Sequence, residues 1–154
     1  SDLVLVSSMG RLLRLPVNDS VLPKMGRLAQ GPMTMRLLPG EELVGSLAMN
    51  VAETDPTLLL VSRHGQMTRI DLTPLRRCQR GDLGMMAVHL SSDEDSVVGL
   101  CSGDVLAGIV TDQKRHGRLD AAAVELAAAG KAWGDQLTLD SNEQIVSVVA
   151  LQTL

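Results

Sequence analysis

Arginines are concentrated in one short stretch of the chain. Residues 63–80 contain a single acid, Asp71, and five arginines: Arg63, Arg69, Arg76, Arg77 and Arg80. The last three lie within five residues and have no acidic neighbour among them. Guanidinium groups bind pairs of phosphate oxygens, so such a cluster favours contact with a phosphate backbone. The simpler alternative is a solvated, charged loop without a ligand.

Other basic residues extend this pattern. Lys24 and Arg27 occupy the corresponding place earlier in the chain, and Arg14, Arg69 and Arg118 recur at the end of a predicted strand. Cations at regular steps along a surface suit phosphate contact, whereas pairing with a nearby acid would make them structural. The predicted phosphate-binding residues are Arg14, Lys24, Arg27, Arg63, Arg69, Arg76, Arg77 and Arg80.

No other chemistry is indicated by the residue pattern. The chain lacks a phosphate-binding P-loop, a GxSxG motif, an HExxH motif and a dinucleotide fingerprint. It has no tyrosine, and Cys78 and Cys101 stand apart without zinc-binding spacing. The acids at 93–95 lack EF-hand spacing and favour a hairpin turn. We expect no catalytic residue, no metal site and no cofactor in this chain.

Composition limits the class of protein further. The chain has 154 residues, 45% hydrophobic, a net charge of −4 and one aromatic residue, Trp133. Base stacking on an aromatic platform is therefore disfavoured, and any phosphate-facing surface must be local. No apolar run approaches the roughly 20 residues that cross a bilayer, so we expect a cytoplasmic protein.

The sequence repeats itself. Residues 3–15 align without a gap to residues 58–70, and residues 27–45 match residues 80–99, with Gly31 on Gly84. A weaker third copy begins at residue 108, where Lys114 replaces the expected turn glycine. We predict three units, residues 2–54, 56–103 and a divergent 104–154.

Each unit is expected to form one four-stranded antiparallel sheet. Short apolar runs are broken by Gly10 or Gly65 in the first hairpin and by an acidic turn in the second. Residues 85–90 are predicted to be the third strand of the second unit. In the third unit the alanine-rich stretch predicts a short helix near 121–129. Such small sheets must stack to bury both faces, as propeller blades do.

The repeated pattern of LLLVS, a turn glycine, a strand-end arginine and a closing VVG resembles the C-terminal blade repeat of bacterial type IIA topoisomerase A subunits. These are the A subunits of DNA gyrase and of topoisomerase IV. The resemblance covers the whole chain and implies a β-pinwheel, a propeller-like ring of blades that exchange a strand with their neighbours. It also implies a basic rim that bends duplex DNA.

Gyrase carries a box of glutamine, two arginines, two glycines, lysine and glycine in one blade loop. The corresponding residues here keep one arginine and two glycines, but have Asp82 for a glycine and Leu83 for the lysine. This degenerate box consists of Cys78, Gln79, Arg80, Gly81, Asp82, Leu83 and Gly84.

The resemblance implies a non-catalytic DNA-binding and DNA-bending module that steers strand passage and DNA supercoiling at the nucleoid. DNA cleavage, ATP and Mg²⁺ would belong to the remaining A-subunit domains and the B subunit, its expected partners. The net charge and the acidic third unit leave open a second interpretation, a protein-interaction module that has lost DNA wrapping. Three units are too few to close the family's ring, so self-association of an open arc is a further expectation.

Overall fold

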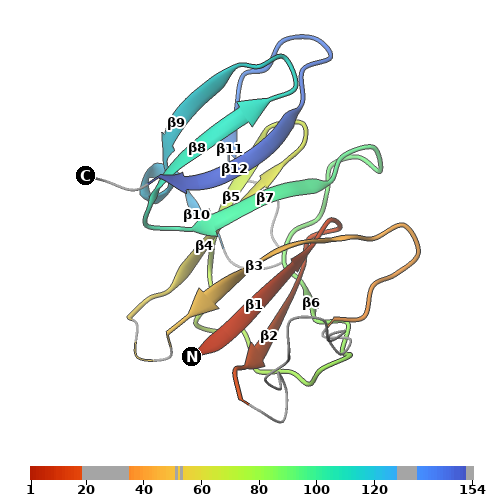
Figure 1. The fold of residues 1–154 in the computed structure, drawn as a ribbon, viewed down its shortest axis with the longest axis vertical. Coiled ribbons are helices and arrows are strands. Elements are labelled where there is room, and N and C mark those ends of the chain that lie inside the picture. The colour runs from red at the N-terminus through yellow and green to blue at the C-terminus, as the bar shows by residue number, and fades with distance from the viewer. Residues whose placement is uncertain (19–34, 51, 53, 128–134, 152–154) are drawn as a thin grey trace, which may run out of the picture.

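The computed structural model describes residues 1–18, 35–50, 52, 54–127 and 135–151. They form the predicted all-β fold, three sheets that follow one another along the long axis of the molecule (Figure 1). Within these residues no helix is long and apolar enough to span a membrane. The strands are β1 (Asp2–Ser7), β2 (Arg11–Pro16), β3 (Leu43–Met49), β4 (Thr57–Ser62), β5 (Gln66–Asp71), β6 (Met85–Met86), β7 (Val97–Ser102), β8 (Leu106–Thr111), β9 (His116–Asp120), β10 (Leu126–Ala127), β11 (Asp135–Gln136) and β12 (Ile145–Leu151).

Each sheet is built on a hairpin with a tight turn. The hairpins are β1–β2, β4–β5 and β8–β9, all antiparallel. Their turns contain a residue with positive φ, Gly10 at 86°, Gly65 at 92° and Lys114 at 62°. Glycine adopts this conformation without a steric penalty, which explains its recurrence in the first two units. Lys114 takes the same turn position, as the repeat alignment predicts.

A further strand pairs with the first strand of each hairpin, and a buried acid joins the two. β3 pairs with β1, β7 with β4 and β12 with β8. The Ser7 hydroxyl donates to Glu41 Oε2 at 2.6 Å, and Thr111 Oγ1 donates to Glu143 Oε2 at 2.7 Å. In the second sheet the corresponding acid is Asp95, which accepts the His64 backbone N–H. Glu41, Asp95 and Glu143 therefore have a structural role.

The sheets exchange strands, and this corrects one prediction. Residues 85–90 were expected to complete the sheet of their own unit, but only β6 forms, and it pairs with β2 of the first sheet. In the same way β10 and β11, which follow β9, pair with β5 of the second sheet. The sheet orders are β3-β1-β2-β6, then β10-β5-β4-β7 with β11 also on β5, then β12-β8-β9. The exchange agrees with the pinwheel that the resemblance implies.

The third unit departs from expectation in two ways. The predicted helix near 121–129 is a single 3-10 turn, Ala121–Ala123, capped by the Asp120 side chain and followed by β10. The buried side chains of Ala121 and Val124 join the core, so tertiary packing overrides the helix preference of alanine. Residues 128 and 129 lie outside the described part. The third sheet has three strands rather than four, since β10 and β11 pair with the second sheet. The unit boundaries themselves stay a prediction.

Two hydrophobic clusters lie between the sheets. Leu58 and Leu60 of β4 pack with the first sheet, whereas Leu59 and Val61 pack with the third. All four side chains are fully buried. β4 is therefore covered on both faces, which explains why its sequence is continuously apolar instead of alternating. A smaller cluster around Leu13 covers the outer face of the first sheet.

Candidate nucleic-acid interface

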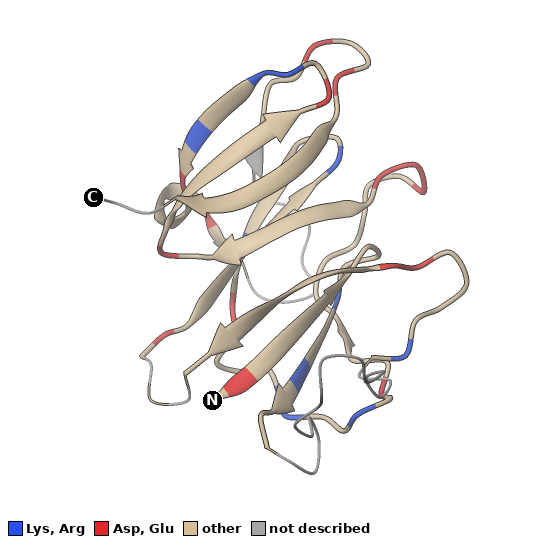
Figure 2. Cartoon of the chain, viewed as in Figure 1, with Lys and Arg blue, Asp and Glu red and all other residues tan. Residues whose placement is uncertain are grey.

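The basic loop of the second unit runs along the edge of the first sheet. Leu72 and Leu75 anchor its start in the core, and the Cys78 backbone N–H donates to the Arg14 carbonyl at 2.7 Å. The loop ends in β6, paired with β2. Several of the chain's basic residues therefore lie along this side of the first sheet (Figure 2).

Two of the loop arginines face solvent. Arg76 and Arg80 are exposed, and no hydrogen bond or ion pair holds their side chains within the described part of the chain. An exposed guanidinium without an internal partner keeps all its donors for a ligand. These two residues fit the predicted role best.

Arg77 has a different role. Its Nε and Nη2 donate to the two carboxylate oxygens of Asp2 at 2.8 and 3.0 Å. Arg14 Nε donates to the same carboxylate at 2.6 Å, and its Nη1 donates to the Leu75 carbonyl. The Asp2 side chain is fully buried, whereas the side chains of Arg14 and Arg77 are 14% and 53% exposed. We call these three residues the Asp2 triad.

The electrostatics of the Asp2 triad follow from this geometry. Burial acts to raise the pKa of Asp2, but the hydrogen bonds from Arg77 and Arg14 outweigh it and hold the pKa below its ordinary value. The same carboxylate raises the pKa of Arg77. The single negative charge of Asp2 is shared by two guanidiniums, so the Asp2 triad keeps one positive charge, and Arg77 is the more exposed of its two arginines.

Two other predicted residues bind backbone carbonyls. Arg69 Nε donates to the Val124 carbonyl at 2.9 Å, and the Arg63 guanidinium donates to the Glu94 carbonyl. Both side chains are partly buried, and each connects its hairpin to a later segment of the chain. Arg69 makes the same kind of contact as Arg14, one unit further on. The structural interpretation therefore applies to Arg14 and Arg69, two of the three recurring strand-end arginines.

The degenerate box forms a turn that fits closely against the first sheet. Gln79 and Asp82 close the turn, since the Gln79 backbone N–H donates to Asp82 Oδ2 at 2.8 Å. Gly81 and Gly84 have φ values of 89° and 78°. A Cβ on Gly84 would lie 2.3 Å from the Leu12 carbonyl oxygen, whereas one on Gly81 would meet no atom within 4 Å. Gly84 is thus required by the close approach of β6 to β2.

The remaining predicted residues and one missed residue complete the set. Lys24 and Arg27 lie outside the described residues. Arg36 was not predicted, but its backbone N–H donates to the Asp82 carbonyl at 2.9 Å and its side chain is exposed. No local pattern indicates it, because its position depends on a contact between two units. Arg36, Arg76 and Arg80 together are called the loop cations below.

The cysteines and acids give no sign of other chemistry. Burial, together with Asp104, raises the pKa of Cys101 to about 11, so its thiol stays protonated at neutral pH. The Cys78 thiol lies 3.6 Å from the Arg76 carbonyl. No group of three or more His, Cys, Asp or Glu side chains that could hold a metal ion occurs among the described residues.

Comparison with known proteins agrees with this architecture. A family model described as the DNA gyrase C-terminal domain, a β-propeller, matches residues 1–48 and 56–100. The DNA gyrase A subunit of Streptomyces coelicolor is 29% identical over 143 residues, and that of Staphylococcus aureus (strain MRSA252) is 30% identical over 152 residues. These alignments cover 84% and 97% of this chain but only 16% and 17% of the relatives.

Solved structures show the same fold. The chain superposes on a DNA gyrase A C-terminal domain with a TM-score of 0.81 and 25% identity, covering 96% of this chain and 49% of that one. A topoisomerase IV C-terminal domain gives a TM-score of 0.79 at 22% identity, covering 99% and 47%. The chain therefore spans about half of each solved domain. With its strand-exchanged sheets and its family match over more than half of its length, the chain belongs to the family of DNA gyrase C-terminal β-propeller domains.

Proposed function

We propose that this chain is a non-catalytic, DNA-contacting module of a type IIA topoisomerase A subunit. The observation that carries the proposal is the set of loop cations, exposed side chains on segments that meet at Asp82. Guanidiniums held on a backbone frame at a sheet edge suit contact with successive phosphates of a duplex. Such contacts position DNA without reading its sequence.

The module would act by curving duplex DNA against this edge and so steering strand passage and supercoiling. Cleavage of DNA and hydrolysis of ATP would belong to the remaining A-subunit domains and the B subunit. Such a module would work in the cytoplasm, at the nucleoid. The family membership supports this assignment, and the loop cations provide the surface that would contact DNA.

A salt titration of binding to a duplex tests the proposal. Each phosphate contact contributes about −0.9 to the slope of log K against log salt concentration, so three loop cations predict a slope of roughly −2.7. The double variant R76A/R80A should lose roughly 1.8 of that slope and weaken binding to all sequences alike. R118A, which removes an exposed arginine from the third sheet, is the matched control and should keep the wild-type slope.

One observation favours the second candidate, a protein-interaction module that has lost DNA wrapping. Of the six predicted arginines that the structure describes, four bind Asp2 or backbone carbonyls inside the molecule: Arg14, Arg63, Arg69 and Arg77. The net charge of −4 points in the same direction. If the wild-type chain fails to bind duplex DNA at low salt, or if R76A/R80A leaves the slope unchanged, the DNA proposal is wrong and this candidate takes its place.

A further inference from the structure

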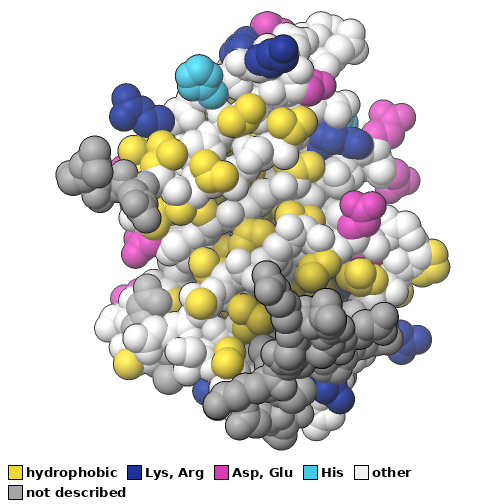
Figure 3. Space-filling view, viewed as in Figure 1, with side chains coloured by type: hydrophobic (Ala, Val, Ile, Leu, Met, Phe, Trp, Pro, Cys, Tyr) yellow, Lys and Arg dark blue, Asp and Glu magenta, His cyan; other side chains and the backbone are white. Residues whose placement is uncertain are grey.

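A cavity of about 480 Å³ lies between the first two units. It is lined by the hairpin turn of the first sheet, the turn into β3 and the segment that leads from β6 into β7. Figure 3 shows hydrophobic side chains exposed beside acidic ones at its right side, where Figure 1 places the turns into β3 and β7. Sites for small molecules have about this size, roughly 300–1,000 Å³. The lining includes both charged and apolar side chains: Arg63, Asp93, Asp95, Met9, Met86 and Leu90.

The segment beside this cavity is longer in the second unit than in the third. At its start, the Ala87 N–H donates to the turn of the first hairpin at 2.8 Å, and the Leu137 N–H donates to the turn of the second hairpin at 2.7 Å. At its end, the acidic turns begin at Ser92 and Asp140. The second unit therefore has two more residues in this segment, and Leu90 from it lines the cavity.

The second hairpin turn has an arginine where the other two turns have an acceptor side chain. Ser8 Oγ and Asp112 Oδ1 each accept the backbone N–H of the residue after the buried acid, at 2.9 Å in both units. Arg63 takes their place and cannot accept, so its guanidinium donates to the Glu94 carbonyl instead. Arg63 Nε is buried and has no hydrogen-bond partner among the residues that the structure describes. A buried donor without an acceptor costs free energy, which a ligand oxygen would recover.

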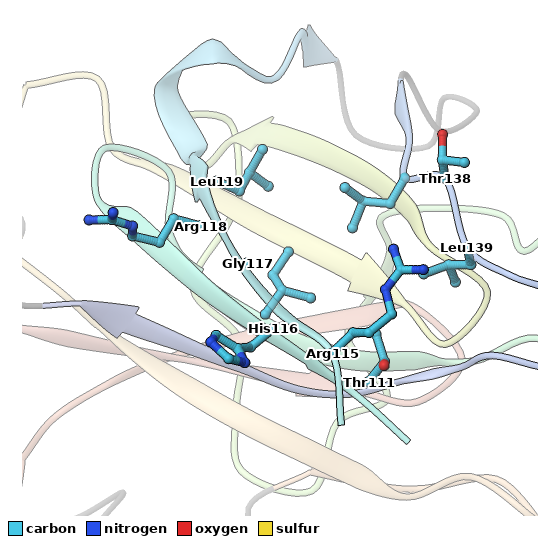
Figure 4. Close-up of a pocket in the computed structure, with 10 residues that line it drawn as sticks. Thr111, Arg115, His116, Gly117, Arg118, Leu119, Thr138 and Leu139 are labelled. Carbon is cyan, nitrogen blue, oxygen red and sulfur yellow. The ribbon is translucent and has the colours of Figure 1, made fainter. Parts of the chain in front are cut away.

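The second unit also lacks the arginine that pairs with the buried acid in the other two units. Arg11 pairs with Glu41 at 3.5 Å, and Arg115 pairs with Glu143 at 3.3 Å. Figure 4 shows the Arg115 side chain extended toward the segment that precedes this acid. The repeat alignment places Gln66, a neutral residue, at the same strand position of the second unit. In the second unit the guanidinium therefore comes from the hairpin turn and not from the strand.

The cavity presents charges of both signs beside an apolar wall. Asp93 is exposed, and no described group bonds to its side chain. Asp93 and Asp95 would repel a simple anion, whereas Arg63 would repel a simple cation. A ligand that carries both charges would be attracted by both sides of the lining. Met9, which is 40% exposed, and Leu90 offer apolar surface to the rest of such a ligand.

We propose that this cavity binds a small zwitterion with an apolar body, of the class of free amino acids with aliphatic side chains. The ligand carboxylate would lie on Arg63, its ammonium group on Asp93 and its side chain on Met9 and Leu90. The longer segment, the turn arginine and the missing strand arginine distinguish the second unit, and all three occur around this cavity. The proposal goes beyond contact with DNA and does not depend on it, since no loop cation lines the cavity.

Titration of the full chain with L-leucine, followed by ¹H–¹⁵N NMR without DNA, tests the proposal. Saturable shifts should be confined to backbone amides around the cavity, including those of Met9 and Ser96. N-acetyl-L-leucine lacks the ammonium group, and L-leucine amide lacks the carboxylate. Each analogue should bind at least roughly tenfold more weakly than L-leucine, because a charge-assisted hydrogen bond is lost.

A matched pair of variants tests the assigned carboxylate. Asp93→Asn should weaken L-leucine binding roughly tenfold and keep the fold, since this exposed side chain makes no described contact. Glu42→Gln removes another exposed carboxylate, from the turn into β3 and outside the cavity lining, and should bind L-leucine as the wild type does. A wild-type spectrum that L-leucine leaves unchanged, a blocked analogue that binds as tightly as L-leucine, or an Asp93→Asn variant with wild-type affinity would each overturn the proposal.

Discussion

The junction between the first and second sheets and the junction between the second and third share a frame but differ in charge. In the first, Arg14 reaches the Leu75 carbonyl while Asp2 binds both Arg14 and Arg77. In the second, Arg69 reaches the Val124 carbonyl. There, Thr57 and Leu126 take the places of Asp2 and Arg77.

This difference separates what the fold requires from what one junction adds. The hydrogen bond from a strand-end arginine to a backbone carbonyl of the next unit occurs at both junctions, so it belongs to the architecture that they share. The carboxylate occurs only in the first, where it recruits an arginine from the basic loop into the structure. Arg77 is therefore unlike its neighbours Arg76 and Arg80, although all three are equivalent as a sequence pattern.

The largest expected effect comes from separating the strands of the first junction. Gly84→Ala puts a Cβ 2.3 Å from the Leu12 carbonyl oxygen at a φ of 78°, so β6 must move away from β2. We expect a loss of about 3 kcal/mol in the free energy of unfolding, measured by urea denaturation. Gly81→Ala is the matched control, with a positive φ but open space, and should cost only about 1 kcal/mol. Equal losses would mean that backbone strain alone matters at Gly84.

Removing the negative charge of Asp2 should have the next largest effect on stability. Asp2→Asn leaves Arg14 and Arg77 without their shared carboxylate and should cost about 2 kcal/mol at neutral pH, less than a fully buried pair because Arg77 is half exposed.

The pH dependence checks the cause of this loss. The pKa of Asp2 is lowered by folding, so its contribution is complete above the ordinary value of 3.8 and disappears as pH falls through the folded value. The difference between wild type and Asp2→Asn should therefore shrink below about pH 4. The pKa of Glu143 is also lowered, by hydrogen bonds from Thr111 and the Asp140 backbone, so both proteins should lose some stability there. A constant difference down to about pH 2 would contradict the ionic interpretation.

Converting the second junction into the first gives a smaller and more specific effect. Thr57→Asp with Leu126→Arg should rebuild the triad around Arg69 and stabilise the chain by roughly 0.5–1 kcal/mol, since the site is partly exposed. Each single change should give less than half of this gain, so a double-mutant cycle in urea should show favourable coupling. If the two changes in unfolding free energy were purely additive, the backbone would position these side chains differently in the two junctions.

The smallest expected effect concerns the third hairpin. Lys114 holds a φ of 62° where the first two hairpins have glycine. Lys114→Gly should raise the midpoint of thermal unfolding, with a gain of about 0.5 kcal/mol from relieved strain. Gln113→Gly, one residue earlier in the same turn and without positive φ, should lower the midpoint instead. A loss with both variants would refute the equivalence of the three turns.

Local signals in the repeat predict much of the architecture. The positions of Gly10 and Gly65 specify tight turns because few other residues tolerate positive φ. The short apolar runs on either side of these glycines predict strands. Each of these signals depends only on residues close together in the chain, and the hairpins that they predict are present.

Pairing between units is not encoded locally. The sequence around Met85 has the pattern of a strand for its own sheet, but two residues pair with the first sheet instead. The helix preference of the alanines after Asp120 is overridden because Ala121 and Val124 complete a core between sheets. A strand pattern predicts an edge that can pair, but it does not specify which sheet it pairs with.

The arginines show the same limit most clearly. The sequence determined that the chain carries a cluster of guanidiniums on a repeated all-β frame, because charge and periodicity are properties of the residues themselves. Only the tertiary structure decided which of them remain available to a ligand. Asp2 lies 75 positions from Arg77, and it is the fold that brings its carboxylate within 2.8 Å of that guanidinium while leaving Arg76 and Arg80 in water.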